Sequence, residues 1–356
     1  MIYKNVLITG GAGFAGSNLA IDLKDYYPEI RVVAFDNLKR RGSELNISRL
    51  KAKGVEFVHG DIRCSEDIHS CKAFDLLIDC SAEPSVHAGM KDSPQTIVRT
   101  NLVGTINCAE AARINNAAIL YLSTSRVYPI EKLNSLDWEE TDSRFRWRTD
   151  NKMVGFSSQG ISEDFPLSGA RSIYGATKLA SELLLQEYAF AYGIPVLINR
   201  CGIITGPWQM GKVDQGVVTL WVISHLFRKG LSYIGFGGNG KQVRDMLHVS
   251  DLFDLVIKQL DRPDNWDGRV YNVGGSNALS VSLLELTNFC IAATGNKIPI
   301  AAVKETSSVD LRIYITDTKK VQNDFSWQPK KDVNQIINDI TSWAQSNRFL
   351  LESVFV

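Results

Sequence analysis

Three side chains of this sequence form a set that can move a proton to and from an alcohol. Tyr174 and Lys178 are four positions apart in a strongly helical stretch, which places the phenol and the ammonium on one helix face. A free phenol, with a pKa of about 10, is a poor base at neutral pH, but a neighbouring ammonium favours the phenolate. Thr124, at the end of an apolar run, would bond the same substrate oxygen. The set predicts removal of a hydroxyl proton beside a hydride acceptor.

A glycine-rich stretch near the start of the chain is typical of a phosphate-binding turn. Gly10, Gly13 and Gly16 are spaced three apart between the apolar run Val6–Thr9 and a helical pattern. Gly10 allows a tight turn, Gly13 lets a pyrophosphate approach the main chain, and Gly16 lets helix and strand pack closely. The free N–H groups of the helix start would face the phosphates. This context predicts a bound dinucleotide, although the glycines alone also fit an ordinary turn.

Acidic residues follow the second and third apolar runs, where an adenosine could be held. Asp36 lies about 20 residues beyond the last glycine, as a ribose-diol contact requires. Arg40 and Arg41 leave NADP as an alternative, because cations could meet a 2′-phosphate, which Asp36 would repel. Asp61 could accept from an adenine amino group, and the alternative is a helix N-cap. NAD is therefore the expected cofactor.

The elements that must position these residues alternate along the chain. Nearly continuous apolar runs occur at 6–9, 32–35, 55–58, 76–80, 119–123 and 196–198, with helical patterns between them. Such runs suit strands that are covered on both faces, so we expect an α/β fold with a Rossmann-type doubly wound parallel sheet. A chain of 356 residues also predicts a smaller C-terminal α/β substrate domain. The expected domains are 1–199 with a return segment at about 248–274, and 200–247 with 275–356.

The later part of the chain carries cations in loops. Lys241 and Arg244 lie in a glycine-rich turn, where a planar guanidinium suits a diphosphate, and a solvated turn is the alternative. The segment 129–172 is a long polar insertion containing Trp138. We expect an elaborate surface loop there, with a lid or a subunit contact as alternatives.

Composition limits the classes of partner. The 39 basic and 39 acidic residues balance to zero net charge, so neither nucleic acid nor an acidic membrane is an expected partner. The six cysteines show no C-x-x-C and no histidines at metal-ligand spacing, so we expect reduced thiols, no metal and a cytoplasmic location. The apolar run 217–227 is too short to span a bilayer.

With these residues in view, the chain resembles the extended short-chain dehydrogenase/reductase superfamily over essentially its whole length. The matching features are Thr9 to Gly16, Asp36, Asp61-Ile62, Thr124 before Val127-Tyr128, Tyr174 with Lys178, and Arg244-Asp245 before His248-Val249. Within the superfamily the likeness points to the CDP-paratose 2-epimerase family, on Phe35 to Leu38, Phe57 to Arg63, Asp214 to Gly216 and Gly240 to Asp245.

The resemblance implies a role for each matching position. NAD would lie against Gly10, Gly13, Phe14, Ala15, Asp36, Asn37, Asp61, Ile62, Ser81, Ala82, Asn101, Tyr174 and Lys178. The catalytic residues would be Thr124, Tyr174 and Lys178. The contacts to a nucleotide-diphosphate sugar would be Ser85, Ser125, Arg126, Lys212, Gln215, Lys241, Arg244 and Arg312. Asn101 is expected to brace the loop after the fourth strand, or else to be an ordinary polar helix residue. A homodimer through a four-helix contact is also implied.

Departures from the superfamily pattern limit which reactions the chain is expected to catalyse. Sugar 4,6-dehydratases need an Asp-Glu pair where this chain has Ser125-Arg126, and UDP-galactose 4-epimerases need an asparagine where it has Ile203. Pro129 also replaces a frequent glycine. The resemblance implies an NAD-dependent epimerase that oxidises a CDP-sugar to a keto-sugar and reduces it on the opposite face. The alternatives are a nucleotide-sugar 4-epimerase or 4-reductase, or a non-catalytic NAD-binding regulatory protein.

Overall fold

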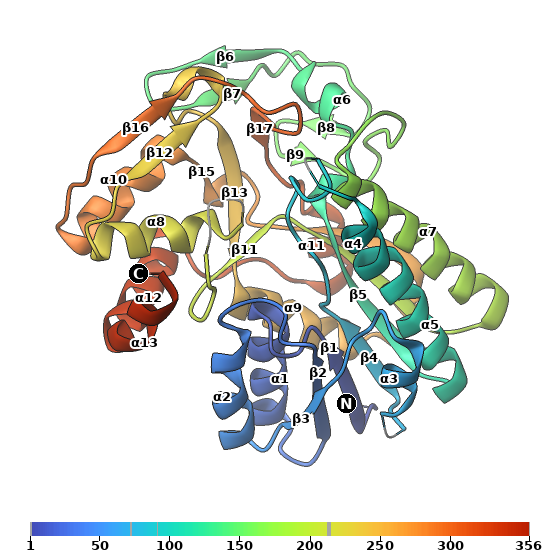
Figure 1. Ribbon diagram of the computed structural model, residues 1–356. Helices are drawn as coiled ribbons and strands as arrows, with labels where there is room; N and C mark the ends of the chain where they lie inside the picture. Colours follow the sequence, from blue (N-terminus) through green and yellow to red (C-terminus); the bar gives the residue numbers. More distant parts are fainter. Residues whose placement is uncertain (1, 72, 91, 212–214, 356) are drawn as a thin grey trace. The chain divides into compact units, whose positions relative to one another are not determined.

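The computed structural model describes residues 2–71, 73–90, 92–211 and 215–355 (Figure 1). The chain divides into two compact units, each of which is built from three segments. Unit 1 comprises Met1–Val127, Ile173–Arg200 and Leu252–Tyr271, and unit 2 comprises Tyr128–Ser172, Cys201–Asp251 and Asn272–Val356.

Unit 1 is organised around a seven-stranded sheet. Its strands are β1 (Asn5–Thr9), β2 (Arg31–Asp36), β3 (Glu56–His59), β4 (Leu76–Asp79), β5 (Ala118–Thr124), β10 (Val196–Cys201) and β14 (Asp267–Val273). Their order across the sheet is β14-β10-β5-β4-β1-β2-β3, and β1 to β5 pair in parallel. All six predicted apolar runs are strands, and the predicted Rossmann-type sheet is confirmed.

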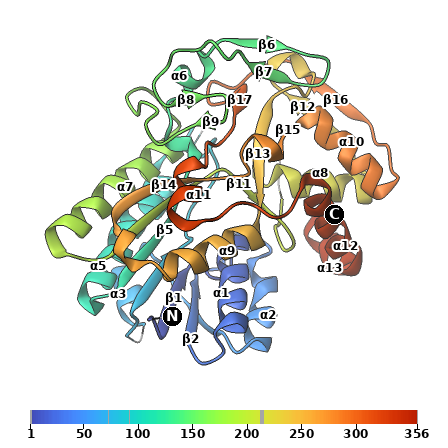
Figure 2. The ribbon, with the colours of Figure 1, turned by 180° about the vertical axis from the view of Figure 1, so that it is seen from behind.

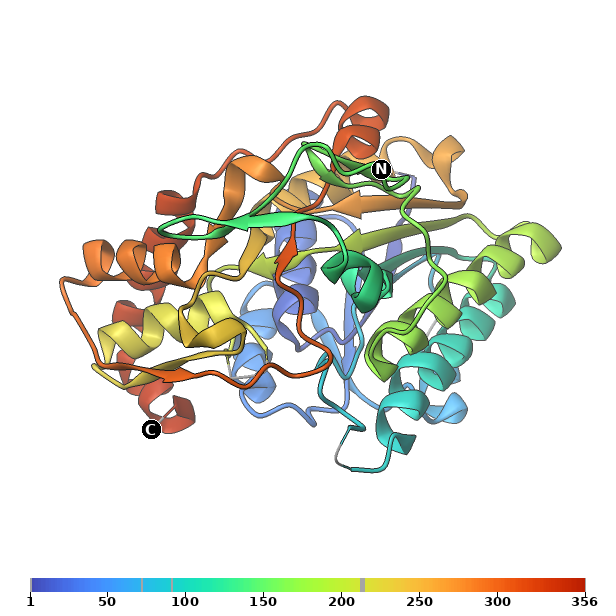
Figure 3. The same cartoon turned by 90° about the horizontal axis from the view of Figure 1, so that it is seen from above.

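Helices cover both faces of this sheet, as Figures 1 and 3 show. α1 (Phe14–Tyr26) and α2 (Asn46–Ala52) lie on one face, while α3 (Ser65–His69), α5 (Gly104–Asn115) and α7 (Ile173–Tyr192) lie on the other. α9 (Val249–Leu260) lies beside α1, where the rings of Phe253 and Tyr26 meet edge to face (Figure 2). Leu77 and Ile119 of the strands pack with Leu185 of α7 in one buried cluster. Burial on both faces explains why the strands are apolar throughout.

The helical segment that contains Asn101 has an irregular start. The structure has α4 (Gln95–Val98), a π-helical turn η2 (Arg99–Val103) and then α5. A Cβ at Gly104 would lie 2.4 Å from Ile62, so glycine allows the close approach of this helix to the end of β3. The π turn contains the fully buried Asn101. Such single-turn π bulges frequently occur at functional sites.

Unit 2 contains a four-stranded sheet and small two-stranded sheets. The four-stranded sheet consists of β11 (Ile203–Thr205), β13 (Val243–His248), β15 (Ser280–Ser282) and β17 (Ile313–Tyr314), while β12 (Leu231–Ile234) pairs with β16 (Ile300–Val303). The helices are α8 (Val217–Leu226), α10 (Leu283–Thr294), α11 (Lys319–Phe325), α12 (Val333–Ser346) and α13 (Arg348–Phe355). Capping boxes at Ser282 and Asp332 fix the starts of α10 and α12.

The insertion belongs to unit 2, whereas the sequence placed it with the first domain. It forms α6 (Ile130–Asn134) and two hairpins, β6 (Trp138–Glu140) with β7 (Phe145–Trp147), and β8 (Phe156–Ser157) with β9 (Gly160–Ile161). The amide of Ile161 donates to the carbonyl of Ile315 at 2.9 Å, beside β17. Pairing with a segment that lies far along the chain explains the difference, because no local pattern encodes it.

Candidate active site

The glycine turn between β1 and α1 has the backbone that the sequence predicted. Gly10 has φ of +64°, and a Cβ there would lie 2.8 Å from the Cys80 carbonyl oxygen. A Cβ at Gly16 would lie only 2.2 Å from the Gly10 carbonyl oxygen. Gly13 is the N-cap of α1 and supplies no side chain, so the first N–H groups of the helix remain available to an anion. These residues fit a pyrophosphate on the backbone.

Asp36 holds the opposite side of this turn. Its carboxylate accepts from the Ala12 amide at 3.1 Å and from the Leu38 amide at 2.8 Å. Burial raises the pKa of Asp36, and these backbone N–H groups oppose that effect. Leu38 takes a φ of +55°, which brings the chain back over the carboxylate. Asp36 therefore lies at the end of β2, next to the glycine turn.

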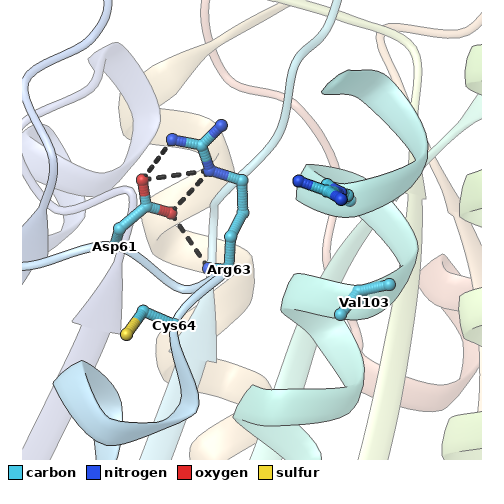
Figure 4. Close-up of a pocket in the computed structure, with 5 residues that line it drawn as sticks. Asp61, Arg63, Cys64 and Val103 are labelled. Atoms are coloured by element: carbon cyan, nitrogen blue, oxygen red, sulfur yellow. Dashed lines mark hydrogen bonds and ion pairs between the residues drawn. The ribbon is translucent and has the colours of Figure 1, made fainter. Parts of the chain in front are cut away.

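A cavity of about 490 Å³ opens where β3 ends, lined by Asp61, Arg63, Cys64, Arg99 and Val103 (Figure 4). The guanidinium of Arg63 pairs with Asp61 at 2.5 Å and holds the pKa of that carboxyl well below its usual range. Asp61 also accepts from Asn37 Nδ2 at 2.9 Å. Cys64 is the N-cap of α3, so Asp61 does not cap that helix. The cavity has polar groups on its edge and an apolar wall, which suit a purine ring.

A buried carboxylate organises the end of β4. Asp79 Oδ1 accepts from Thr9 Oγ1 at 2.7 Å, and from both the amide and the hydroxyl of Ser81 at 2.9 and 2.5 Å. The Ser81 hydroxyl therefore points inward, towards Asp79. The hydroxyl of Ser85 accepts from the His87 amide at 3.3 Å.

Asn101 braces the loop after β4. Its Oδ1 accepts from the Glu83 amide at 2.7 Å, and its Nδ2 donates to the Glu83 carbonyl at 3.1 Å. Its own carbonyl accepts from the hydroxyls of Thr105 and Ser181, both at 2.9 Å. The side chain is fully buried, so it positions the loop and α7 together.

α7 presents Tyr174 and Lys178 on one buried face, packed against β5 and the one-turn helix η3 (Ser125–Val127). The Lys178 ammonium lies 4.2 Å from the centre of the Tyr121 ring. Burial would lower the pKa of Lys178, but the Tyr121 and Tyr174 oxygens and the Asp79 carboxylate outweigh burial and raise it. The Lys178 ammonium therefore stays charged at neutral pH.

The next position on the same helix face is Glu182. Its carboxylate pairs with Arg200 of β10 at 2.7 Å and accepts from the Ser123 hydroxyl at 2.5 Å. Thr124 follows Ser123 on β5, is buried, and accepts from the Arg126 amide at 3.2 Å. The ion pair fixes α7 against β10, and the hydrogen bond from Ser123 fixes α7 against β5, the strand that carries Thr124.

Three predicted substrate cations lie on neighbouring segments of unit 2. The Val243 amide donates to the Arg312 carbonyl at 3.0 Å, which joins β13 to the segment before β17. Arg244 donates from its guanidinium to the carbonyls of Val243 and Leu311 at 2.7 and 2.6 Å. Lys241 pairs with Glu140 at 2.8 Å. The cations are therefore held in a defined arrangement and are not scattered over a solvated turn.

The predicted site residues fall into two groups, one in each unit. Unit 1 brings together those at the carboxyl ends of β1 to β5 with those on α7, and unit 2 holds Lys241, Arg244 and Arg312. Gln215 is half-buried just before α8, and Lys212 lies outside the described residues. The roles of Tyr121, Asp79 and Glu182 were missed, because an apolar strand or helix pattern gives no signal for one polar partner within it.

In the described ranges, no group of three His, Cys, Asp or Glu side chains is placed to hold a metal ion. The six cysteines all lie within those ranges, and none of them forms a disulfide. No helix in the described part of the chain is long and apolar enough to cross a membrane.

The sheet, the glycine turn and the tyrosine–lysine pair define a dinucleotide-binding enzyme of the extended short-chain dehydrogenase/reductase type. The chain belongs to the NAD dependent epimerase/dehydratase family, whose model matches residues 6–274. NAD is accordingly its cofactor, and the glycine turn, Asp36 and the cavity beside Asp61 fit it.

Relatives of two activities span almost the whole chain. The chain is 32% identical to a CDP-paratose 2-epimerase of Salmonella typhi, over 96% of this chain and 99% of the relative. It is 30% identical to a dTDP-glucose 4,6-dehydratase of Actinoplanes, over 96% and 98%. A crystal structure of dTDP-glucose 4,6-dehydratase from Bacillus anthracis in complex with NAD has a TM-score of 0.77 and 25% identity, with 99% of each chain covered.

Proposed function

We propose that this protein is a nucleotide-sugar epimerase that oxidises a sugar carbon transiently and reduces it again from the opposite face. The observation that carries the proposal is the buried face of α7, with Tyr174 and Lys178 packed against the end of β5. This set can take a proton from a secondary alcohol and return it. The reaction has no net redox change, so it needs no external reductant.

The chain's own residues divide the proton chemistry between them. Lys178 keeps a positive charge beside the phenol, which favours the phenolate of Tyr174. The Tyr174 oxygen accepts the proton of the substrate hydroxyl, while Thr124 donates a hydrogen bond to that substrate oxygen and steadies its developing charge. When bound, NAD supplies the acceptor for the hydride and gives it back. Tyr174 then returns the proton after the keto-sugar has presented its other face.

The substrate that we infer is a CDP-sugar, with carbon 2 as the epimerised centre. The relative of Salmonella typhi named a CDP-paratose 2-epimerase supports this choice over the whole length of the chain. Arg244, Lys241 and Arg312 suit a diphosphate, since guanidinium and ammonium groups bind phosphate oxygens. The reaction would convert CDP-paratose to CDP-tyvelose, or act on a related sugar nucleotide.

A 4,6-dehydratase is the second candidate, because relatives of that name match nearly as much of the chain. Water loss needs an acid and a base beside the sugar. Ser125 and Arg126 follow Thr124 here, and neither supplies a carboxylate. A 4-epimerase or 4-reductase would use the same tyrosine–lysine pair, while a regulatory protein would not need that pair.

A substrate panel tests these possibilities directly. The purified protein would be incubated with CDP-paratose and with UDP-, GDP- and dTDP-sugars, without reduced cofactor, and the products identified by NMR. We expect C2 inversion of CDP-paratose, and we expect Tyr174→Phe to lose turnover but keep bound NAD. Inversion at C4, loss of water or dependence on added NADH would each select a rival enzyme. Bound NAD without turnover on any sugar would favour the regulatory protein.

We also infer a homodimer and a cytoplasmic location. Exposed apolar side chains gather on the neighbouring helices α5 and α7, and they include Ile114, Leu183, Leu184, Phe190 and Tyr192. A second copy of this surface would bury them in a four-helix contact. The absence of disulfides among the six cysteines is consistent with a reducing compartment. Light scattering of the purified protein measures the oligomeric state.

A further inference from the structure

The β6–β7 hairpin contacts the guanidinium of Arg312 with two of its aromatic rings. The guanidinium carbon lies 4.0 Å from the centre of the Trp138 ring and 5.7 Å from that of Phe145. Phe236, from another loop of unit 2, adds a third ring at 5.2 Å. A cation within about 6 Å of a ring centre is attracted by the negative face of the ring. Arg312 therefore lies in an aromatic cage supplied largely by the insertion.

The cage holds Arg312 without using its N–H donors. No side-chain hydrogen bond joins this guanidinium to another described residue, and its buried Nε has no partner there. By contrast, Arg144 of the same hairpin is bonded to Glu285 and Ser280. A guanidinium fixed by ring faces keeps its plane and retains its donors for an incoming anion.

The hairpin also holds the second cation. Glu140 of β6 accepts from the Lys241 ammonium at 2.8 Å, and the Phe145 amide donates to the Lys241 carbonyl at 2.9 Å. Both contacts involve the turn that leads into β13, next to Arg244. The hairpin thus contacts two of the three described cations of unit 2 that were predicted to contact the nucleotide-diphosphate sugar.

Further bonds fix the hairpin in unit 2. The Ser143 hydroxyl donates to Glu285 of α10 at 2.6 Å, next to the ion pair between Arg144 and the same carboxylate. On the other side, Asn134 Oδ1 accepts from the Arg312 amide at 3.0 Å, and its Nδ2 donates to the Asp310 carbonyl at 2.9 Å. The insertion is thereby tied to α10 and to the segment that carries Arg312.

We propose that the β6–β7 hairpin positions the diphosphate-binding cations, with Trp138 as the positioning residue for Arg312. This inference rests on the proposed function, because it takes the ligand of these cations to be the diphosphate of a sugar nucleotide. It assigns a role to the insertion, as a platform that orients the phosphate-binding groups of unit 2. Trp138 acts through Arg312 and need not touch the substrate.

Three variants of the full-length protein test this role. Trp138→Leu removes the ring under Arg312, and Trp138→Phe restores a smaller one. Trp147→Leu is the matched control, because Trp147 lies on the same hairpin but packs edge to face on Phe156, with ring centres 5.3 Å apart. Phe236→Leu removes another face of the cage from a different loop, and it replaces Trp138→Leu if that variant does not fold.

The measurement is calorimetric binding of CDP, UDP, GDP and dTDP, with NAD binding as the reference for unit 1. We expect Trp138→Leu to weaken binding of the preferred diphosphate about five- to tenfold, because one cation–π contact is lost. Trp138→Phe should recover most of it, and Trp147→Leu should match wild type, with NAD affinity unchanged in every variant. With substrate, the loss should be in KM and not in kcat.

The outcomes separate this inference from the proposed function. If wild type binds none of the four diphosphates, the sugar-nucleotide substrate is wrong, and the inference falls with it. If wild type binds one of them but Trp138→Leu binds it equally well, or no more weakly than Trp147→Leu does, the positioning role is wrong while the proposed function stands.

Discussion

Replacing Arg200 with methionine should destabilise unit 1 strongly, because it leaves a charge buried without its partner. The side chains of Arg200 and Glu182 are only 5% and 1% exposed, and they are paired at 2.7 Å. Removing one member of a buried ion pair costs roughly 3–5 kcal/mol. The Ser123 hydroxyl still donates to Glu182 in the variant, so we expect a loss near the lower end, about 3 kcal/mol.

The assay is urea unfolding of the NAD-free protein, monitored by circular dichroism. Arg269→Met is the matched control, since Arg269 and Asp267 form an ion pair of similar length, 2.8 Å, whose side chains are 37% and 55% exposed. Such a surface pair contributes about 0.5 kcal/mol. In the double variant Arg200→Met/Glu182→Gln the buried charge is gone, and about half or more of the loss should be recovered.

Two results would refute this reasoning. A cost for Arg200→Met no larger than that for Arg269→Met would mean that the pair is not desolvated as the structure has it. A double variant that is less stable than Arg200→Met alone would mean that the lost free energy comes from packing and not from the unpaired carboxylate.

Two further predictions concern the glycine turn and acid stability. Gly16→Ala places a Cβ 2.2 Å from the Gly10 carbonyl oxygen, so the affinity for NAD, measured by calorimetry, should fall more than tenfold. Gly230→Ala is the control and should leave the affinity unchanged, because the nearest atom to its Cβ would be 3.6 Å away. Burial lowers the pKa of His248 to about 4, below the value of about 6.5 in the unfolded chain. The folded protein therefore has its full stability from neutral His248 above pH 6.5. Up to roughly 3 kcal/mol of that stability is lost as the pH falls towards 4. His248→Gln should therefore show a smaller loss of urea stability between pH 7 and pH 4.5, and an equal loss would contradict this assignment.

The parts of the fold that follow local rules were predictable from the sequence. The six core strands were found because their apolar runs are nearly unbroken, and the glycine turn because Gly10 and Gly16 have no sterically possible replacement. Asp36 was placed correctly at the end of β2 because that edge of a parallel sheet is where ligands bind.

The parts that depend on distant pairing were not predictable. Trp138 and Arg312 are in contact, but neither residue type nor spacing indicates a partner so far along the chain. The contact between the Lys178 ammonium and the Tyr121 ring was not predictable either, since a tyrosine in an apolar strand is most simply interpreted as a core residue. The insertion was assigned to the first domain for this reason, because its strands are short and find their partners only in the folded unit.

The hydrogen bonds of Asn101 link the movements of three segments of unit 1. One amide side chain ties the loop after β4, and its carbonyl ties α5 and the helix of the tyrosine–lysine pair. A shift of the loop after β4 would therefore move α7 with it or break hydrogen bonds of a fully buried residue. Asn101 thereby couples the position of the loop after β4 to that of the helix that carries Tyr174 and Lys178.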